Sequence, residues 1–196
     1  LSDSIGLKNN DDFSRTFEQT NAFSILVGCT LVTFLLFNLI AITNLYGEGY
    51  AGAKHVIALL LFAGCISCFG SGIGPYIYSK GYTKFGLFTN LVWTAIFLIT
   101  SIIYIDRLGA TALALGMTLG YLINLTVTIV YLAKNQEINL LLLYKSYLGI
   151  FVMFVMYLFA INIQDHLSSL NVFFLSIFAS FLVFFIVLNY IIPKKI

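Results

Sequence analysis

Long apolar stretches constrain this chain more than any other feature of its sequence. Six of them recur, and each is long enough to cross the roughly 30 Å hydrocarbon core of a bilayer as a helix that rises about 1.5 Å per residue. They cover residues 22–43, 55–79, 85–105, 109–133, 146–163 and 170–192. A helix satisfies its own backbone hydrogen bonds in lipid, which a single strand cannot do. The sequence therefore predicts an all-α fold, a polytopic membrane bundle of about six transmembrane helices.

Composition agrees with this prediction and excludes several classes of function. Hydrophobic residues make up 60% of the chain and charged residues 9%, whereas an ordinary soluble domain is roughly 45–50% apolar and about 25% charged. The net charge of +2, without a basic run interleaved with aromatics, argues against nucleic acid as a partner. The sequence shows no Ser/His/Asp set, no paired carboxylates and no phosphate loop, so we expect no enzyme.

The cations lie in the short polar turns and at the chain ends, and their distribution predicts an orientation. If the helices alternate in direction, one side of the membrane receives Lys8, Arg15, Lys80, Lys84, Lys134, Lys145, Lys194 and Lys195, and the other receives Lys54 and Arg107. Cytoplasmic loops of membrane proteins carry an excess of Lys and Arg. We therefore expect a multi-pass protein with both ends of the chain in the cytoplasm.

Amides and hydroxyls form a stripe on each of two central stretches, where no Asp, Glu, Lys or Arg lies well inside the apolar run. The stripes comprise Asn90, Thr94 and Ser101 in the third stretch, and Tyr121, Asn124, Thr128 and Tyr131 in the fourth. Polar groups are costly in hydrocarbon unless they find partners or water, so these side chains should face inward. They predict either a substrate cavity for a polar head group or sugar, or hydrogen bonds that hold the bundle together.

Small residues mark two further positions. The segment Gly70-x-Gly72-x-Gly74-Pro75 predicts a kink or a broken helix, because proline lacks a backbone donor and clashes with the preceding turn. Such a bend can be a hinge for alternating access or a static feature. In the fourth stretch, Ala112, Gly116 and Gly120 recur every four residues and predict close packing against a neighbouring helix.

The cysteines predict neither a metal site nor a disulfide. Cys65-x-x-Cys68 has the spacing of half a zinc site, but the sequence offers no second pair nearby, and Cys29 also lies inside an apolar run. We interpret all three as packing residues and expect no metal and no cofactor.

The order of three short segments resembles a known family. Residues 45–50 (LYGEGY), 78–84 (YSKGYTK) and 108–114 (LGATALA), with the span that carries Asn90 between the last two, resemble the C-terminal lobe of polysaccharide (O-antigen type) flippases. These belong to the multidrug/oligosaccharidyl-lipid/polysaccharide exporter superfamily. The resemblance covers roughly residues 1–133, and the two final helices match the extra C-terminal pair of longer members.

The resemblance implies a layout for the chain. It would be the C-terminal part of a MATE-like transporter whose N-terminal lobe belongs to the same protein. Residues 1–20 would be a cytoplasmic loop or the end of a preceding helix, 21–133 the four-helix part of the C-terminal lobe, 134–145 a cytoplasmic loop, and 146–196 the C-terminal helix pair.

The implied function is flipping of undecaprenyl-pyrophosphate-linked oligosaccharide across the cell (inner) membrane for O-antigen biosynthesis, with H⁺ or Na⁺ as coupling ion. The implied partners are the lipid-linked oligosaccharide, membrane lipids, and the polymerase and export machinery of the polysaccharide. The charged cavity residues typical of such flippases have no counterpart here. Two alternatives remain open: a multidrug or small-molecule exporter of the same superfamily, and a non-transporting membrane scaffold subunit.

Overall fold

The chain forms a bundle of helices. The computed structural model describes residues 10–135, 140–163 and 169–190. Within them lie α2 (Asn10–Phe37), α3 (Leu39–Leu45), the 3₁₀ helix η1 (Glu48–Ala53), α4 (Lys54–Phe69), α5 (Ile73–Ser79), α6 (Thr83–Leu108), α7 (Ala110–Lys134), α8 (Leu140–Ile163) and α9 (Ser169–Tyr190). The described residues include no strand, so the predicted all-α class is confirmed for this part of the chain.

Several helices are long and apolar enough to cross a membrane. Three qualify on their own: Thr83–Leu108, Ala110–Lys134 and Asn171–Asn189. The count rises to five if each of two bent pairs, α2 with α3 and α4 with α5, forms one span, and the shorter apolar helix Tyr147–Ile163 lies beside them. By length and composition the described residues thus fit a multi-pass membrane protein with three to five candidate spans, and a count of about six stays a prediction.

Both bent pairs break where local chemistry interrupts the helix. The first breaks at Asn38, with a bend of 73°; this residue leaves the helical backbone conformation (φ −104°, ψ 20°), and its side-chain amide donates to the Phe34 carbonyl oxygen at 2.8 Å. The second, α4 with α5, bends by 42° between Phe69 and Ile73, inside the segment where the sequence predicts a kink. Glycines at 70 and 72 disfavour a continuous helix there.

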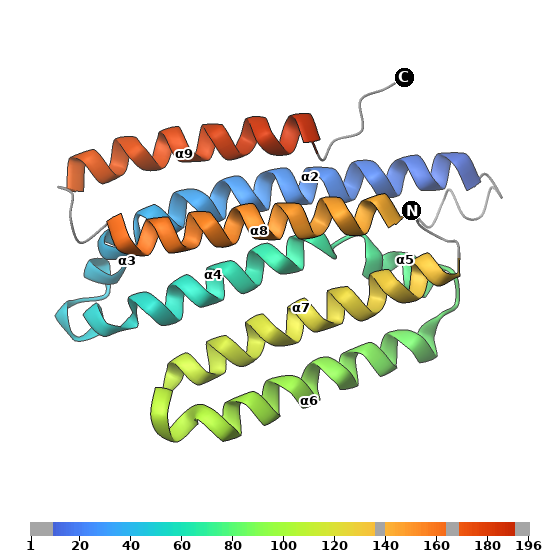
Figure 1. Cartoon of the computed structure of the whole chain (residues 1–196), viewed down its shortest axis with the longest axis horizontal. Helices are drawn as coiled ribbons and strands as arrows, with labels where there is room; N and C mark the ends of the chain where they lie inside the picture. The colour runs from blue at the N-terminus through green and yellow to red at the C-terminus, as the bar shows by residue number, and fades with distance from the viewer. Residues whose placement is uncertain (1–9, 136–139, 164–168, 191–196) are drawn as a thin grey trace.

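The helices lie side by side in a single elongated bundle (Figure 1). Helix α2 packs against α9, α4 and α8, while α7 lies between α4 and α6. Helix α6 therefore forms one edge of the bundle, with most of its packing against α7. These two helices form a hairpin whose turn is the single residue Gly109, with φ 53°. A side chain would strain this backbone conformation, which glycine adopts readily.

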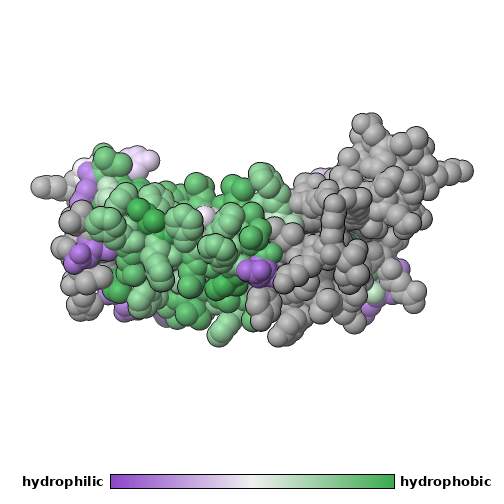
Figure 2. Space-filling model, turned by 90° about the horizontal axis from the view of Figure 1, so that it is seen from above, coloured by the Kyte–Doolittle hydropathy of each residue, from purple (hydrophilic) through white to green (hydrophobic). Residues whose placement is uncertain are grey.

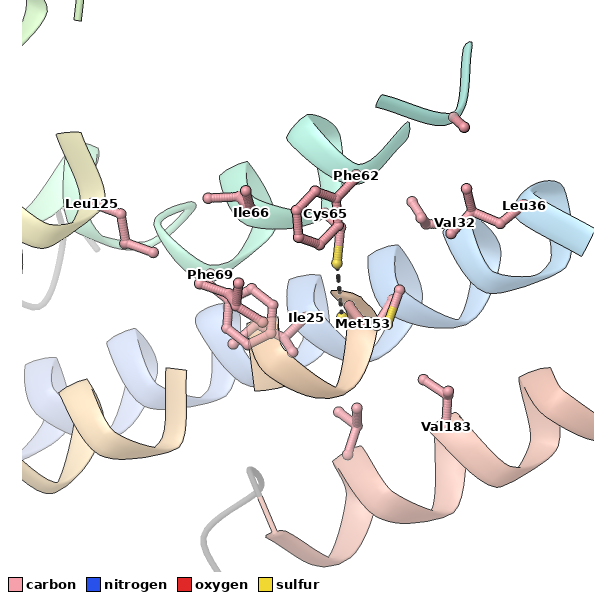
Figure 3. Packing of buried hydrophobic residues seen from close by; sticks show 14 of the residues in the cluster. Ile25, Val32, Leu36, Phe62, Cys65, Ile66, Phe69, Leu125, Met153 and Val183 are labelled. Carbon is pink, nitrogen blue, oxygen red and sulfur yellow. Dashed lines mark hydrogen bonds between the residues drawn. The ribbon is translucent and has the colours of Figure 1, made fainter. Parts of the chain in front are cut away.

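A buried cluster joins α4 to its neighbours. Phe62 and Phe69 of α4 pack towards Ile25 of α2 and Met153 of α8, while Ile66 lies on the side of α4 that faces α7 (Figure 3). Each of these five side chains is buried. Burying such a side chain stabilises by about 1.5–3 kcal/mol relative to exposing it to water. Because lipid tails are also apolar, close packing rather than removal from water is what holds these helices to one another inside a bilayer.

The outer surface is strongly apolar. Helix α9 exposes a series of phenylalanines, namely Phe173, Phe174, Phe178, Phe181 and Phe185. Most of the coloured surface in Figure 2 is hydrophobic, and hydrophilic residues gather mainly at one end. Such a surface would be an aggregation hazard in water, but it matches the hydrocarbon of a bilayer.

Two element boundaries differ from the sequence prediction. Asn10–Thr20, expected as a loop or the end of a preceding helix, form the first turns of α2, and Leu140–Lys145, expected in a loop, begin α8. A hydropathy pattern locates only the apolar part of a helix, so it does not mark the largely polar residues 10–20. Residues 140–144 are apolar, and the sequence prediction began this helix too late because it placed the boundary at Lys145.

Candidate functional site

A pocket of about 360 Å³ opens where the bend between α4 and α5 faces α6 and α7. Amides, hydroxyls, aromatic rings and glycines make up most of its wall: Ser67 and Gly70 at the end of α4 and beyond it, Gly74 and Tyr78 of α5, Gly86, Thr89, Asn90 and Trp93 of α6, and Tyr121, Asn124 and Thr128 of α7. Apolar residues such as Ile66, Ile73, Ile77 and Leu125 complete the lining.

Glycines on three of the walls keep this pocket open. A Cβ atom added at Gly74 would have no neighbour within 4 Å, whereas at Gly70 it would meet Leu125 at 3.4 Å and at Gly86 it would meet Ile77 at 3.4 Å. The bend moves α5 out of line with α4. The bend between α4 and α5 and the missing side chains of Gly70, Gly74 and Gly86 together leave the volume of the pocket unfilled.

Asn124 is the polar centre of the pocket. Its side-chain nitrogen donates to the backbone oxygen of Thr89 on α6 at 3.1 Å, and its side-chain oxygen accepts a hydrogen bond from the Thr128 hydroxyl at 3.3 Å. One side chain thus both lines the pocket and bonds to the next helix. The two interpretations of the polar stripe, cavity and interhelical bonding, coexist at this residue.

The structure brings four of the six predicted cavity residues together and leaves two outside. Asn90, Tyr121, Asn124 and Thr128 line the pocket. Thr94, one turn further along α6, is exposed outside the pocket, and its hydroxyl donates to the Asn90 carbonyl oxygen at 2.9 Å.

Ser101 lies deep in the α6–α7 contact instead. It is buried, and its hydroxyl has no hydrogen-bond partner among the described residues. A Cβ atom added at Gly116 would lie 3.0 Å from this hydroxyl oxygen. The side chain therefore faces α7 rather than a cavity.

The small residues of α7 explain where the pocket ends. A Cβ atom at Gly116 would lie 2.9 Å from the Phe97 carbonyl oxygen, and one at Gly120 would lie 2.9 Å from the Trp93 ring. Ala112, the third member of this series, is fully buried. Close approach of α7 to α6 along these positions fills the space between the two helices.

Among the predicted kink residues, Gly70 and Gly74 line the pocket and Gly72 lies in the break itself. Pro75 is exposed and occupies the third position of α5. The first turn of a helix leaves its backbone donors without intrahelical partners, so a proline there removes no helical hydrogen bond. The break thus lies at residues 70–72, ahead of Pro75.

Sequence reasoning missed Asn21, which joins α2 to the break. The residue is buried at 3% exposure, and its side-chain oxygen accepts from the Gly72 backbone nitrogen and from the Ser71 hydroxyl, both at 3.4 Å. The oxygen thereby caps a donor that the interrupted helix leaves free. Nothing in the sequence pairs residues so far apart.

Trp93 was missed as well, although it is the only tryptophan of the chain. It stacks on Phe97, with ring centroids 5.7 Å apart, and lies at 47° to the Tyr121 ring with 5.6 Å between centroids. Its indole nitrogen is buried and has no hydrogen-bond partner in the described part of the chain. The one signal in the sequence is its place one helical turn beyond Asn90, a predicted cavity residue.

The pocket is uncharged. None of its described lining residues is Asp, Glu, Lys, Arg or His. Cys29 and Cys65, whose sulfur atoms lie 3.4 Å apart, belong to the α2–α4 contact instead. Within residues 10–135, 140–163 and 169–190, no group of three His, Cys, Asp or Glu residues could hold a metal ion.

A second hollow, of about 580 Å³, lies between α2 and α9. Its wall is almost entirely apolar: Phe23, Leu26, Val27, Thr30, Leu31 and Phe34 from α2, and Ile177, Ser180, Phe181 and Phe184 from α9. Both hydroxyls donate within their own helices, Thr30 to the Leu26 oxygen and Ser180 to the Ser176 oxygen, at 2.7 Å each. This groove therefore offers no hydroxyl proton to a ligand.

Comparison with known proteins adds no relative: no family model, curated protein or solved structure matches this chain. The fold class, the break in α4–α5 and the chemistry of the two hollows are the ground for a functional proposal.

Proposed function

We propose that this chain is part of a membrane transporter that flips undecaprenyl-pyrophosphate-linked oligosaccharide across the cytoplasmic membrane for O-antigen biosynthesis. The observation that carries the proposal is the pocket between α4–α5, α6 and α7, which brings amides and hydroxyls together among helices whose described outer surface is largely apolar. Hydrogen-bonding side chains around a cavity in apolar helices are costly without polar partners. A polar cargo that enters the cavity would provide such partners.

An amphiphilic cargo needs two environments at once, and this chain offers both. The pocket supplies amides and hydroxyls for a polar head. The groove between α2 and α9, beside the exposed phenylalanines of α9, supplies apolar surface compatible with a lipid tail. The resemblance of residues 45–50, 78–84 and 108–114 to O-antigen flippases favours a lipid-linked sugar over other amphiphiles.

The broken helix supports movement of the pocket wall. Gly70 lines the pocket just before α5 and Gly74 lines it within α5, so a change of the 42° bend would change the pocket. Discontinuous helices commonly form the substrate sites of transporters, where they permit the rearrangements of alternating access. In this proposal α5 moves relative to α4, and the Asn21 contact holds the conformation seen here.

The proposal is tested by blocking the pocket without touching the α6–α7 contact. Asn90→Trp places a large ring at the pocket wall, and Thr94→Trp places the same ring one turn away, outside it. Each variant of the intact protein is returned to a strain that lacks the gene. We expect Asn90→Trp to abolish surface polysaccharide and Thr94→Trp to retain it at equal protein level in the membrane. Equal polysaccharide from both variants would contradict a transport path through this pocket.

The two alternatives predict different phenotypes. A multidrug exporter would change tolerance to cationic compounds on deletion and leave the surface polysaccharide intact. A scaffold subunit would show no change of flux with Asn124→Trp while the protein remained folded. Loss of polysaccharide without a change in drug tolerance is the result that the flippase proposal requires.

A further inference from the structure

The uncharged wall of the pocket restricts the part of a cargo that it can bind. Pyrophosphate carries several negative charges, and proteins bind such groups with Arg, Lys or metal ions. No described lining residue is a cation or a carboxylate, and burying a charge without a partner is strongly unfavourable. The pocket therefore suits a neutral part of the cargo rather than its pyrophosphate.

The amides have hydrogen-bonding capacity that the protein does not use. An amide nitrogen carries two donors and an amide oxygen has two acceptor positions. Asn124 uses one donor on Thr89 and one acceptor position on Thr128, which leaves one of each. The side chain of Asn90 has no hydrogen-bond partner among the described residues. Paired donors and acceptors of this kind complement hydroxyl groups, which donate and accept at once.

Aromatic rings supply another part of the wall. Trp93 and Tyr121 stand at 47° to each other with 5.6 Å between centroids. The face of an aromatic ring is electronegative and attracts polarised hydrogens such as the C–H groups of a sugar ring. The volume of about 360 Å³ lies near the lower end of the roughly 300–1,000 Å³ that is usual for ligand pockets, so a single sugar unit fits better than a whole oligosaccharide.

We propose that this pocket binds one uncharged pyranose unit of the transported glycan, an inference that rests on the proposed function. Asn90 and Asn124 provide hydrogen bonds to the sugar hydroxyls, and Trp93 with Tyr121 provides the apolar platform. The pyrophosphate and the lipid tail bind elsewhere in the transporter.

Trp93 gives a direct binding signal. The intact protein is purified in a detergent without a sugar head group and titrated with methyl glycosides of glucose, galactose, rhamnose and N-acetylglucosamine while tryptophan emission is recorded, and a Trp93→Phe variant identifies the contribution of Trp93. We expect a saturable change with at least one glycoside. Asn90→Ala should weaken this binding about fivefold to tenfold, the usual effect of losing one or two hydrogen bonds. Thr94→Ala is the matched control and should leave the affinity unchanged.

Charged probes complete the test. Inorganic pyrophosphate and tetraphenylphosphonium should neither change Trp93 emission nor compete with the glycoside. Competition by either probe, or no saturable signal from any glycoside in a chain with a normal helical circular-dichroism spectrum, would overturn the inference. Equal glycoside affinities of Asn90→Ala and Thr94→Ala would overturn it as well.

The cellular assay of Asn90→Trp is read separately. If that variant blocks polysaccharide export while no glycoside binds the chain, the sugar assignment fails and the transporter proposal stands. If glycosides bind while export continues with the pocket blocked, the transporter proposal fails.

Discussion

The two hollows of this bundle differ in a way that their sizes do not predict. The groove between α2 and α9 has a volume of about 580 Å³, against about 360 Å³ for the pocket beside the α4–α5 break. In the larger hollow, Thr30 and Ser180 donate their protons to their own helices. In the smaller one, the Asn124 side chain donates a hydrogen bond to α6 and keeps one unused donor and one unused acceptor position. Hydrogen-bonding groups that are not used within the protein, rather than volume, distinguish the candidate site from an apolar surface groove.

The difference begins with backbone geometry. A hydroxyl on a straight helix can reach the carbonyl one turn earlier, as Thr30 does, and then contributes little to its surroundings. The Ser67 and Thr89 hydroxyls of the smaller pocket also bond locally, to the Gly64 and Gly86 carbonyl oxygens. The pocket differs through its two amides, Asn90 and Asn124, and through the α4–α5 break that lies beside it. Away from the break, the glycines of α7 bring α6 close enough to exclude a ligand.

The largest effect is expected where α6 and α7 approach most closely. In Gly116→Ala the new Cβ would lie 2.9 Å from the Phe97 carbonyl oxygen, so the backbones must separate. We expect a loss of about 1–3 kcal/mol, as is typical of overpacking, and a lower midpoint of thermal unfolding in detergent. Gly64→Ala in α4 is the matched control, because its Cβ has no neighbour within 4 Å. Equal midpoints for the two variants would contradict the close α6–α7 approach.

A smaller effect should separate the bridging amide from a locally bonded hydroxyl. Asn124→Ala removes the bond to Thr89 on α6, and hydrogen bonds between membrane helices contribute roughly 0.6 kcal/mol on average and up to about 1.7. Thr30→Val removes a bond within one helix and should change stability by less than about 0.5 kcal/mol. Thermal unfolding of both variants in the same detergent measures the difference. A larger loss of stability in Thr30→Val than in Asn124→Ala would contradict the view that the interhelical bond of Asn124 contributes more than the local bond of Thr30.

These contrasts also show how far sequence reasoning reaches. Hydropathy was sufficient for the helical class and for the continuous helices α6 and α7, since a 20-residue apolar run has few alternatives in lipid. The small residues of α7 carry a local signal that predicts close approach, and the structure has α6 packed against them. A bend in this segment was predictable for the same reason, since glycine acts on its own backbone, although the break lies at residues 70–72 rather than at Pro75.

The site was predictable only in part, because it depends on which helix faces each residue. Asn90, Thr94 and Ser101 share one face of α6 by helical periodicity. Yet Asn90 meets the pocket, Thr94 is exposed outside it, and Ser101 meets α7. One face thus meets different surroundings along its length, and no periodicity encodes that change. The hydrogen bond from the Gly72 backbone nitrogen to the Asn21 side chain likewise joins residues far apart in the sequence, so no local pattern predicts it.

A modest effect is expected from removing that long-range cap. Asn21→Ala leaves the Gly72 amide and the Ser71 hydroxyl without their shared acceptor. Both bonds are 3.4 Å long, so the loss should lie near 0.5 kcal/mol, the lower end of the range for helix caps. Hydrogen exchange at Gly72 should become faster. Asn38→Ala is the control, since in the described structure the Asn38 side chain donates to the Phe34 oxygen of the adjoining helix α2, and it should leave exchange at Gly72 unchanged.

The smallest effect is expected at Pro75, the exposed third residue of α5. Pro75→Ala restores a backbone N–H in the first turn of α5, where the N–H groups of a helix have no carbonyl partner within that helix. The side chain at this position is exposed. The glycines at 70 and 72 remain, so the bend of 42°, the stability to within about 0.5 kcal/mol and the surface polysaccharide produced in cells should all be retained. Loss of polysaccharide from a variant that keeps its unfolding midpoint would mean that the moving joint extends into α5. The segment whose conformation matters for transport would then include the first turn of α5 as well as residues 70–72.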